Sequence, residues 1–282
     1  MKILMIGATG TFAKYVIPSL KKKRIEIKAL VRNDNRAEIA KANGVDETVN
    51  GDLNDLNSLR NAIQNVDGIY YLNPVFMENE IKMGLNMVKA AEEAKIDKFV
   101  FSSVYHPSLS LENHVSKRPI EEALYESELK FVILQPAMFM QTVGNTLSVI
   151  KQTKLIGLPY SKSAKMSYVD YRDVADVVAI AFTDNKLDNG TFELSSDGMY
   201  NRIELAEIIS NIIGYTVEAK EIDFDDFSKG MPDGFTKNGL RTMFEHYDHC
   251  GFHGGNSLIL ETILNRKPRT LQAYFEEMEK EF

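Results

Sequence analysis

Apolar, strand-like runs that alternate with helical patterns restrict the fold of this chain more than any other feature. The strand-like runs are residues 2–6, 25–31, 47–50, 67–72, 98–103 and 130–135. The helical patterns between them are residues 12–22, 36–43, 56–64, 78–94 and 115–127. Such alternation is typical of an α/β fold with a doubly wound parallel sheet that carries helices on both faces.

The rhythm changes after residue 140, which predicts a second, smaller α+β lobe. Its expected elements are a strand at 190–194, a helix at 202–213, a strand at 216–222 and a closing helix at 270–280. We expect a nucleotide-binding domain over residues 1–150, with residues 166–183 returning to it. Residues 151–282 would form the smaller lobe, so that the two parts interleave.

Composition excludes several classes of partner. The 282 residues include 40 acidic and 33 basic side chains, a net charge of −7, which does not favour binding to nucleic acid or to an anionic membrane. No apolar run approaches the roughly 20 residues of a membrane span. Cys250 is the only cysteine, so no intramolecular disulfide can form. The first strand begins at Lys2, which leaves no room for a signal peptide, and we expect a soluble cytoplasmic protein.

A glycine turn joins the first predicted strand to the first predicted helix. Five of its residues are predicted to hold a pyrophosphate: Gly7, Thr9, Gly10, Thr11 and Phe12. Glycine permits the tight turn and the close approach of backbone N–H groups, and a helix N-terminus favours an anion. Ala13 stands where a third glycine is usual, and alanine is small enough for helix–strand packing. A glycine turn without a ligand is the alternative.

Arg32 ends the second predicted strand, where a dinucleotide site meets the adenosine ribose. An acidic residue there accepts hydrogen bonds from the 2′-hydroxyl of NAD, whereas arginine pairs with the 2′-phosphate of NADP. The sequence therefore predicts NADP(H) in preference to NAD(H). Two alternatives remain: Asp34 could reach a ribose, and Arg32 could be an ordinary exposed charge.

Three further positions follow the third and fourth predicted strands. Asp52 and Leu53 are candidates for the adenine end, although Asp52, Asp55 or Asn54 could equally cap the next helix. Asn73 follows the fourth strand and is the candidate for the ribose on the nicotinamide side. Phe76 lies in the same loop, at the carboxyl edge of the sheet where ligands bind, and is a candidate for substrate contact.

Several later segments resemble the NmrA-like branch of the atypical short-chain dehydrogenases. They run from Asn113 through Lys117, Glu121 and Leu124 and on to Phe131–Gln141, then Val169–Ala175, Phe252–Asn256 and Asn265–Thr270. The resemblance covers nearly the whole chain. It implies a Rossmann domain that binds NAD(P), with a small C-terminal lobe closing over the nicotinamide end. The branch includes reductases of quinones, carbonyls and dyes and also regulators that bind the cofactor without using it.

One departure from the short-chain dehydrogenase pattern bears on catalysis. The wider group uses Tyr-x-x-x-Lys, in which lysine lowers the pKa of the tyrosine so that the phenol can transfer a proton. Here Asn113 stands four residues before Lys117, and asparagine cannot donate such a proton. Lys117 remains a candidate for the nicotinamide ribose or for catalysis. The alternative is an exposed helical lysine paired with Glu121.

Other side chains are candidates to assist the reaction. Ser103 could orient a substrate carbonyl, and Tyr105 or His106 could supply a proton, although His106 could be only a loop residue; His114, beside Lys117, is a similar candidate. Pro136 is expected at the cofactor, and a pocket wall is expected from the two residues Met138 and Phe139. An apolar stripe of this kind is more often core.

The histidines at 246, 249 and 253, close to Cys250, lack the paired spacing of a structural zinc site, so no metal is predicted.

The first functional hypothesis is an NADPH-dependent reductase that transfers a hydride to a quinone or conjugated carbonyl. The second is a non-catalytic NADP(H) sensor that binds a protein partner. A nucleotide-sugar epimerase or dehydratase is the third, and its chemistry relies on the missing tyrosine.

Overall fold

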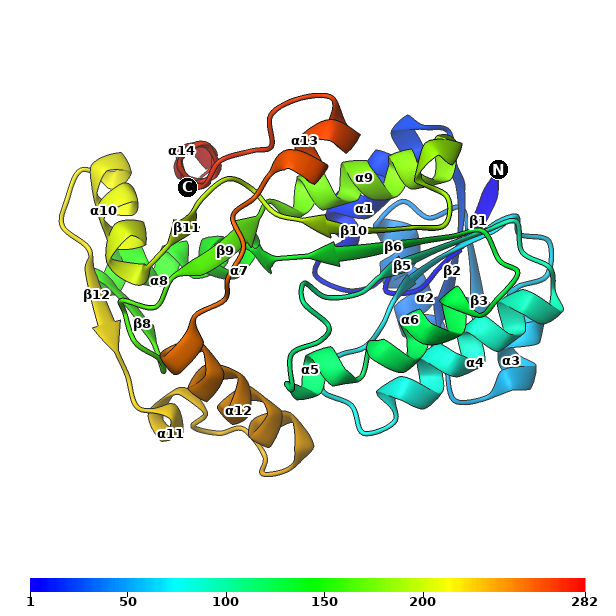
Figure 1. The fold of residues 1–282 in the computed structure, drawn as a ribbon, viewed down its shortest axis with the longest axis horizontal. Coiled ribbons are helices and arrows are strands. Elements are labelled where there is room, and N and C mark those ends of the chain that lie inside the picture. Colours follow the sequence, from blue (N-terminus) through cyan, green and yellow to red (C-terminus); the bar gives the residue numbers. More distant parts are fainter. Residues whose placement is uncertain (282) are drawn as a thin grey trace. The chain divides into compact units, whose positions relative to one another are not determined.

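The computed structural model describes residues 1–281, and a seven-stranded sheet is its central feature (Figure 1). The strand order is β10-β6-β5-β4-β1-β2-β3. Six strands pair in parallel: β1 (Lys2–Met5), β2 (Glu26–Val31), β3 (Glu47–Asn50), β4 (Gly68–Leu72), β5 (Lys98–Ser102) and β6 (Phe131–Pro136). β10 (Gly190–Leu194) lies at the edge. The order reverses between β1 and β4, which makes this the switch point where such sheets bind ligands. The predicted doubly wound α/β fold is confirmed.

Helices cover both faces of this sheet. They are α1 (Ala13–Lys22), α2 (Asp34–Ala42), α3 (Leu56–Ala62), α4 (Glu80–Glu93), α5 (Glu112–Val115), α6 (Arg118–Tyr125) and α9 (Tyr171–Thr183). Apolar residues of α3, α4 and α6, among them Leu59, Met87 and Leu124, pack on Phe99 and Phe101 of β5. The α1 and α9 helices lie together on the other face, where Ser19 Oγ donates to Asp176 Oδ1 at 3.0 Å (Figure 1).

The contact between α4 and α6 requires a residue without a side chain at position 84. A Cβ atom added to Gly84 would overlap the side chain of Ile120, which is fully buried. We expect Gly84→Ala to lower the free energy of unfolding by about 1–3 kcal/mol, although alanine is the better helix former. Urea denaturation would measure it, and Ile120→Val in the same chain should recover part of the loss. An unchanged or raised stability would contradict the overlap.

The helix predicted over residues 115–127 is instead two short helices, α5 and α6. The break falls at Ser116 and Lys117. Pro119 explains it, because proline has no backbone N–H to donate to the preceding turn and is tolerated only at the start of a helix. The break matters because Lys117 becomes the N-cap residue of α6.

The chain divides into two compact units, one of residues 1–136 and 174–193 and the other of residues 137–173 and 194–282. The first boundary therefore falls at residue 136 and not near 150, and the segment that returns is 174–193 and not 166–183. The reason is that the chain leaves the large sheet at the end of β6. The next strand, β7 (Met138–Phe139), belongs to a different sheet, in which it pairs with β9 (Met166–Val169).

The second unit combines small sheets with helices. One sheet has the order β11-β9-β7, with β11 (Met199–Tyr200), and the other pairs β12 (Glu218–Glu221) with β8 (Leu155–Leu158). The remaining elements are α7 (Met140–Gly144), α8 (Leu147–Thr153), α10 (Arg202–Ile213), α11 (Phe224–Phe227), α12 (Phe235–Cys250), α13 (Leu258–Leu264) and α14 (Leu271–Glu281); the short 3-10 helix η1 (Asn185–Leu187) belongs to the first unit. The predicted helix at 202–213 is confirmed. The predicted strand at 190–194 forms as β10, but it joins the large sheet and not, as the sequence had predicted, the smaller lobe. The sequence did not predict α12, because its aromatic residues and Gly239 are weak helix formers.

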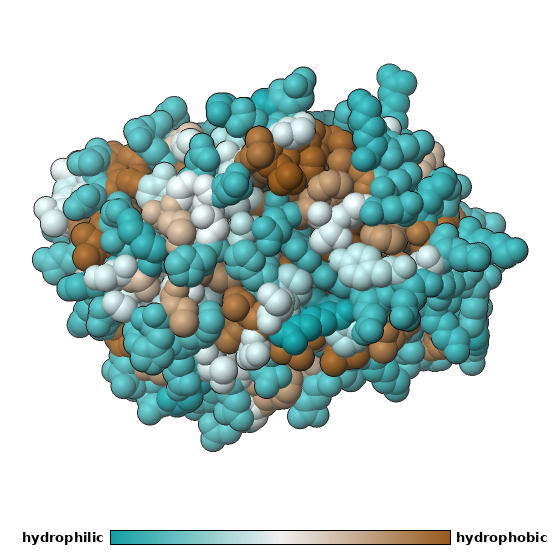
Figure 2. All heavy atoms as spheres, viewed as in Figure 1, coloured by the Kyte–Doolittle hydropathy of each residue, from teal (hydrophilic) through white to brown (hydrophobic). Residues whose placement is uncertain are grey.

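Two further observations concern the helices of the described residues and their apolar surface. None of the helices within residues 1–281 is long and apolar enough to cross a membrane. Apolar side chains gather on the surface over α13, where Leu258 and Ile259 are exposed (Figure 2).

Candidate functional site

The glycine turn has the geometry that an anion cradle needs. Gly7 has a φ of +90°, a conformation that favours glycine, and its carbonyl accepts from the Gly10 N–H at 2.9 Å. A Cβ on Gly10 would lie only 3.2 Å from that same oxygen. The N-cap residue of α1 is Phe12, which has no side-chain oxygen to cap the helix. The N-terminal N–H groups of α1 therefore suit a pyrophosphate, and the buried Ala13 fills the place of the third glycine.

The residues predicted to meet the adenosine end lie around the loops after β2 and β3. Arg32 is exposed, and its positive charge helps to lower the pKa of Asp52 after the larger effect of hydrogen bonds from Asn54. Lys82 contributes to the same shift. Arg32 and Asp52 are thus close enough to interact electrostatically. Asp34 accepts from the Asn50 side chain at 3.1 Å.

Asp52 is not the N-cap residue of α3, which was the alternative role for it. Asp55 caps α3 by accepting from the Asn57 N–H at 2.9 Å. Asp52 instead accepts from the Asn54 N–H at 2.9 Å. The Leu53 carbonyl accepts from Asn86 of α4 at 3.1 Å, which ties this loop to the next layer of helices. Neither Asp52 nor Asn54 is therefore needed as the N-cap of α3.

Lys117 lies in a buried polar cluster after β4. Its Nζ forms an ion pair with Glu80, and both residues are 2% exposed. Glu80 Oε1 also accepts from Ser116 Oγ at 2.9 Å and from Asn73 Nδ2 at 3.3 Å. Tyr71 donates its hydroxyl hydrogen to Asn73 Oδ1. Glu80 therefore holds both of the side chains that the sequence assigned to the nicotinamide ribose.

The alternative interpretation of Lys117, an exposed lysine paired with Glu121, is wrong. The break between α5 and α6 turns the side chain inward, and Glu121 has other partners. Burial lowers the pKa of Lys117 to about 7, whereas the contact with the Glu80 carboxylate favours the charged form. Glu80 was missed because an acidic residue in the first turn of a helix is common and has no distinctive spacing.

A second buried carboxylate, Glu121, contacts Ser103. Ser103 Oγ donates to Glu121 Oε1 at 2.5 Å, and Gln135 Nε2 donates to Oε1 and Oε2 at 2.9 and 3.1 Å. A serine hydroxyl has one hydrogen, and here Glu121 accepts it. In this arrangement Ser103 cannot donate a hydrogen bond to a substrate carbonyl, as the sequence had suggested, unless Glu121 returns a proton to it.

The other candidate proton donors are engaged in the loop after β5. Burial, followed by the charge of Glu193, raises the pKa of Tyr105 to about 12, so this phenol stays protonated at neutral pH. His106 has a φ of +54°, and its Nδ1 lies 3.0 Å from Glu193 Oε1. His114 Nδ1 lies 2.9 Å from the carbonyl oxygen of His106. These contacts fit the alternative in which His106 shapes the loop.

Two buried polar atoms close to the ends of β5 and α5 have no hydrogen-bond partner within residues 1–281. They are Ser102 Oγ and Asn113 Oδ1. Buried polar atoms are normally paired, so unpaired atoms indicate that a ligand or water completes the site. Together with the glycine cradle, they indicate that the carboxyl edge of the sheet fits a bound dinucleotide.

The residues predicted to contact the substrate, Phe76 and the wall of Met138 and Phe139, belong to different units. Phe76 lies in the first unit, with a φ of +56° in the loop after β4. Met138 and Phe139 form β7 of the second unit, where the Phe139 ring packs edge-on against Tyr171 at 4.7 Å. Pro136 is buried at the end of β6 and its carbonyl accepts from the Tyr105 N–H at 3.1 Å. The roles of these four residues in binding remain predictions.

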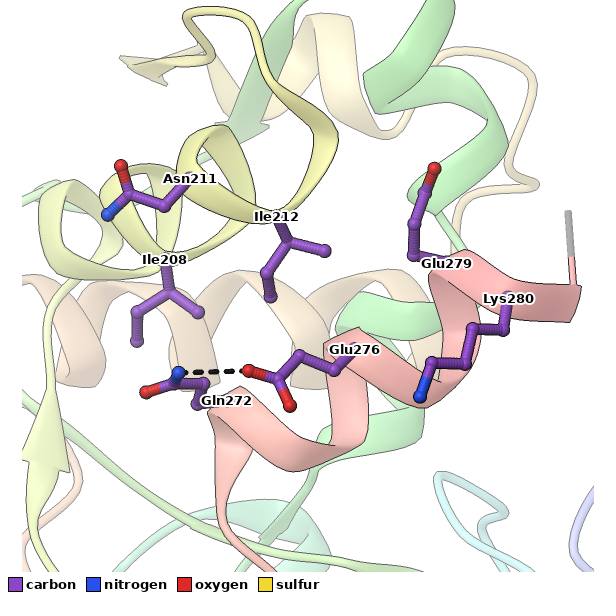
Figure 3. A pocket seen from close by; sticks show the side chains of 7 residues that line it. All are labelled: Ile208, Asn211, Ile212, Gln272, Glu276, Glu279 and Lys280. Atoms are coloured by element: carbon purple, nitrogen blue, oxygen red, sulfur yellow. Dashed lines mark hydrogen bonds between the residues drawn. The ribbon is translucent and has the colours of Figure 1, made fainter.

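A pocket elsewhere, of about 470 Å³, has no residue in common with the predicted site. It lies between α10 and α14 of the second unit (Figure 3), and seven residues line it: Ile208, Asn211, Ile212, Gln272, Glu276, Glu279 and Lys280. Gln272 and Glu276 bond to one another across one turn of α14, at 2.9 Å. Among the described residues, no group of three or more His, Cys, Asp or Glu side chains is arranged to hold a metal.

The strand order and the glycine turn define an α/β protein of the Rossmann type. The chain belongs to the NmrA-like family, whose model matches residues 1–280. It is similar to the NAD(P)H azoreductase of Xenophilus azovorans, with 26% identity over 81% of this chain and 80% of that protein. A photosystem II assembly factor of Cyanidium caldarium shares 27% identity over 74% of this chain and 70% of its own length.

A solved structure has the same fold. The NADPH complex of a quinone oxidoreductase from Escherichia coli superimposes with a TM-score of 0.83 and 21% identity, covering 98% of this chain and 99% of that one.

Proposed function

We propose that this protein is an NADPH-dependent oxidoreductase that reduces a quinone or another conjugated carbonyl acceptor. The observation that carries the proposal is the buried Asn73–Glu80–Lys117 cluster next to the switch point of the sheet. A buried ammonium group is costly unless it is paired, and this one is paired beside the end of β4, at the switch point where such sheets bind ligands. The names of the azoreductase and quinone oxidoreductase relatives support the same class of reaction.

Different residues along the carboxyl edge of the sheet would bind different parts of the cofactor. The turn from Gly7 to Phe12 would hold the pyrophosphate and Arg32 the 2′-phosphate. Asn73 and Lys117 would orient the nicotinamide ribose. When bound, the reduced cofactor supplies a hydride to the acceptor. A quinone suits a site without the short-chain dehydrogenase tyrosine, because its reduced oxygen is a stabilised phenolate that needs no strong acid.

A non-catalytic sensor is the second candidate. Asn113, in the position of the usual tyrosine, is not an acid that can transfer a proton, and the relative from Cyanidium caldarium is named as an assembly factor. In this function the protein would bind a partner differently in its NADPH and NADP⁺ forms. The third hypothesis, sugar epimerisation, gains nothing from the site, because the raised pKa of Tyr105 is the opposite of what that chemistry needs.

Turnover separates the two candidates. Purified protein, NADPH and a panel of quinones and aromatic aldehydes should give loss of the absorbance of reduced nicotinamide. We expect Lys117→Met to reduce kcat/KM by about 10²-fold, since it removes a charged hydrogen-bond donor at the reacting end. Because this variant leaves Glu80 buried and unpaired, Glu80→Gln with Lys117→Met is the matched control for folding. Tight NADP(H) binding without turnover of any acceptor would reject the reductase and favour the sensor.

A further inference from the structure

We propose that Glu121 and Tyr125 form a proton relay that connects solvent with Ser103 and delivers a proton to the oxygen of the reduced acceptor. The proposal rests on the reductase function and adds two residues to it. It gives this chain a proton source in place of the tyrosine that Asn113 replaces.

The helix α6 aligns the residues of the relay. Glu121 and Tyr125 are four residues apart, so they lie on the same side of the helix about one turn from each other. Lys117, the N-cap residue, is another four residues back. Glu121 is 6% exposed and Tyr125 is 52% exposed. This side of α6 therefore leads from a buried end, next to the candidate site, to the surface.

Two hydrogen bonds mark the ends of this path, and one helix turn separates them. Ser103 directly follows β5, and its hydroxyl donates to Glu121 Oε1 at 2.5 Å. Burial raises the pKa of Tyr125, the hydrogen bond with Thr191 lowers it, and the negative charge of Glu121, one helix turn away, raises it further. The Tyr125 hydroxyl also lies 3.0 Å from Thr191 Oγ1 at the surface. Glu121 thus has one hydroxyl on its buried side and one on its exposed side.

The hydrogen-bond directions explain why Glu121 is needed. Ser103 has a single hydrogen, which it can give to an acceptor oxygen only if it receives another. Glu121 is the group that can return one, after its carboxylate has taken a proton from water through Tyr125. Over the whole step the acceptor carbonyl gains a hydride and a proton, reduced nicotinamide is oxidised, and water supplies the proton. Ser103, Glu121 and Tyr125 end as they began.

The two classes of acceptor provide a sharp test. An aldehyde becomes a strongly basic alkoxide and requires a proton in the same step, whereas a quinone becomes a weakly basic phenolate. Glu121→Gln should therefore slow aromatic aldehyde reduction by about 10²-fold and quinone reduction by less than about threefold. Tyr125→Phe removes only an exposed hydroxyl group, so this variant is expected to fold normally. It should slow the aldehyde reaction about threefold to tenfold and change its solvent deuterium isotope effect.

Glu122→Gln is the matched control, because it makes the same chemical change at the next, exposed position of α6. It should leave both reactions unchanged. A structural role for Glu121 would slow both acceptors equally, and that result, or no effect of either relay variant, would overturn the relay while leaving the reductase intact. Absence of turnover by the unaltered protein with every acceptor would instead overturn the reductase and the relay together.

Discussion

Glu80→Gln is expected to lower the free energy of unfolding by about 3–5 kcal/mol at pH 6. Glutamine keeps the shape of the side chain but removes the negative charge that faces Lys117. Both residues are 2% exposed, so the ammonium group would be left charged and unpaired in the interior. Removing one partner of a buried ion pair costs far more than removing both. Guanidinium-induced unfolding, together with hydrogen exchange of the backbone amides of α4, would measure the lost free energy of unfolding.

The loss should shrink as pH rises. Burial lowers the folded-state pKa of Lys117 to about 7, below the ordinary value of 10.5 in an unfolded chain. Between these values the unfolded state binds more protons, so the stability of the unaltered protein increases with pH across this window. Without the Glu80 carboxylate, which favours the charged form, the pKa of Lys117 falls further in the variant. The variant therefore begins to gain stability at a lower pH than the unaltered protein, and the loss shrinks as pH rises to about 7. At pH 9 the loss should therefore be clearly smaller than at pH 6.

Two variants control this experiment. Glu78→Gln makes the same change at an exposed position two residues earlier and should alter stability by less than about 0.5 kcal/mol. Glu80→Gln combined with Lys117→Met removes both charges and should recover most of the loss. If the single variant loses the same free energy at pH 6 and pH 9, Lys117 does not titrate in this window and the explanation is wrong.

Arg32→Asp is expected to reverse the preference for the cofactor. If Arg32 binds the 2′-phosphate, its loss and the new repulsion should weaken NADPH binding by about 10²-fold or more. NADH lacks the phosphate, so its affinity should stay the same or improve, because aspartate can accept from the 2′-hydroxyl. Titration of nicotinamide fluorescence with each cofactor would measure both affinities without requiring turnover.

Arg24→Asp makes the same change of charge between α1 and β2, at the opposite edge of the sheet. Its effect on both cofactors should be small and should disappear as salt is raised. An NADPH preference that survives Arg32→Asp would remove Arg32 from the site. It would leave the nicotinamide end of the proposal untouched, because Lys117 and Asn73 bind a part that both cofactors share.

The sequence was most informative where short-range rules apply. The period of two in strands and of 3.6 in helices predicted the six parallel strands and their helices within a few residues. The glycine turn was identified because its geometry depends on residues that are adjacent in the chain. The same rules failed for residues 115–127, where Pro119 divides one expected helix, and for α12, whose residues have low helix propensity.

The partners of buried polar groups could not be predicted in this way. Lys117 and Glu80 are 37 residues apart, and Ser103 and Glu121 are 18 residues apart. In the sequence, Glu121 is the nearer partner for Lys117, and the i, i+4 rule favours that pair. The structure places each glutamate with a different partner, because the break before α6 turns Lys117 toward α4.

The sequence by itself therefore determined the fold class, the glycine turn and membership of the NmrA-like family, since these depend on periodicity, backbone freedom and local motifs. Only the tertiary structure decided that Lys117 is buried against Glu80, that Ser103 donates to Glu121, and that Asp55 and not Asp52 caps α3. The physical reason is that a buried charge or polar hydrogen is costly unless it is paired. Which partner lies within bonding distance is determined only by the folding of the whole chain.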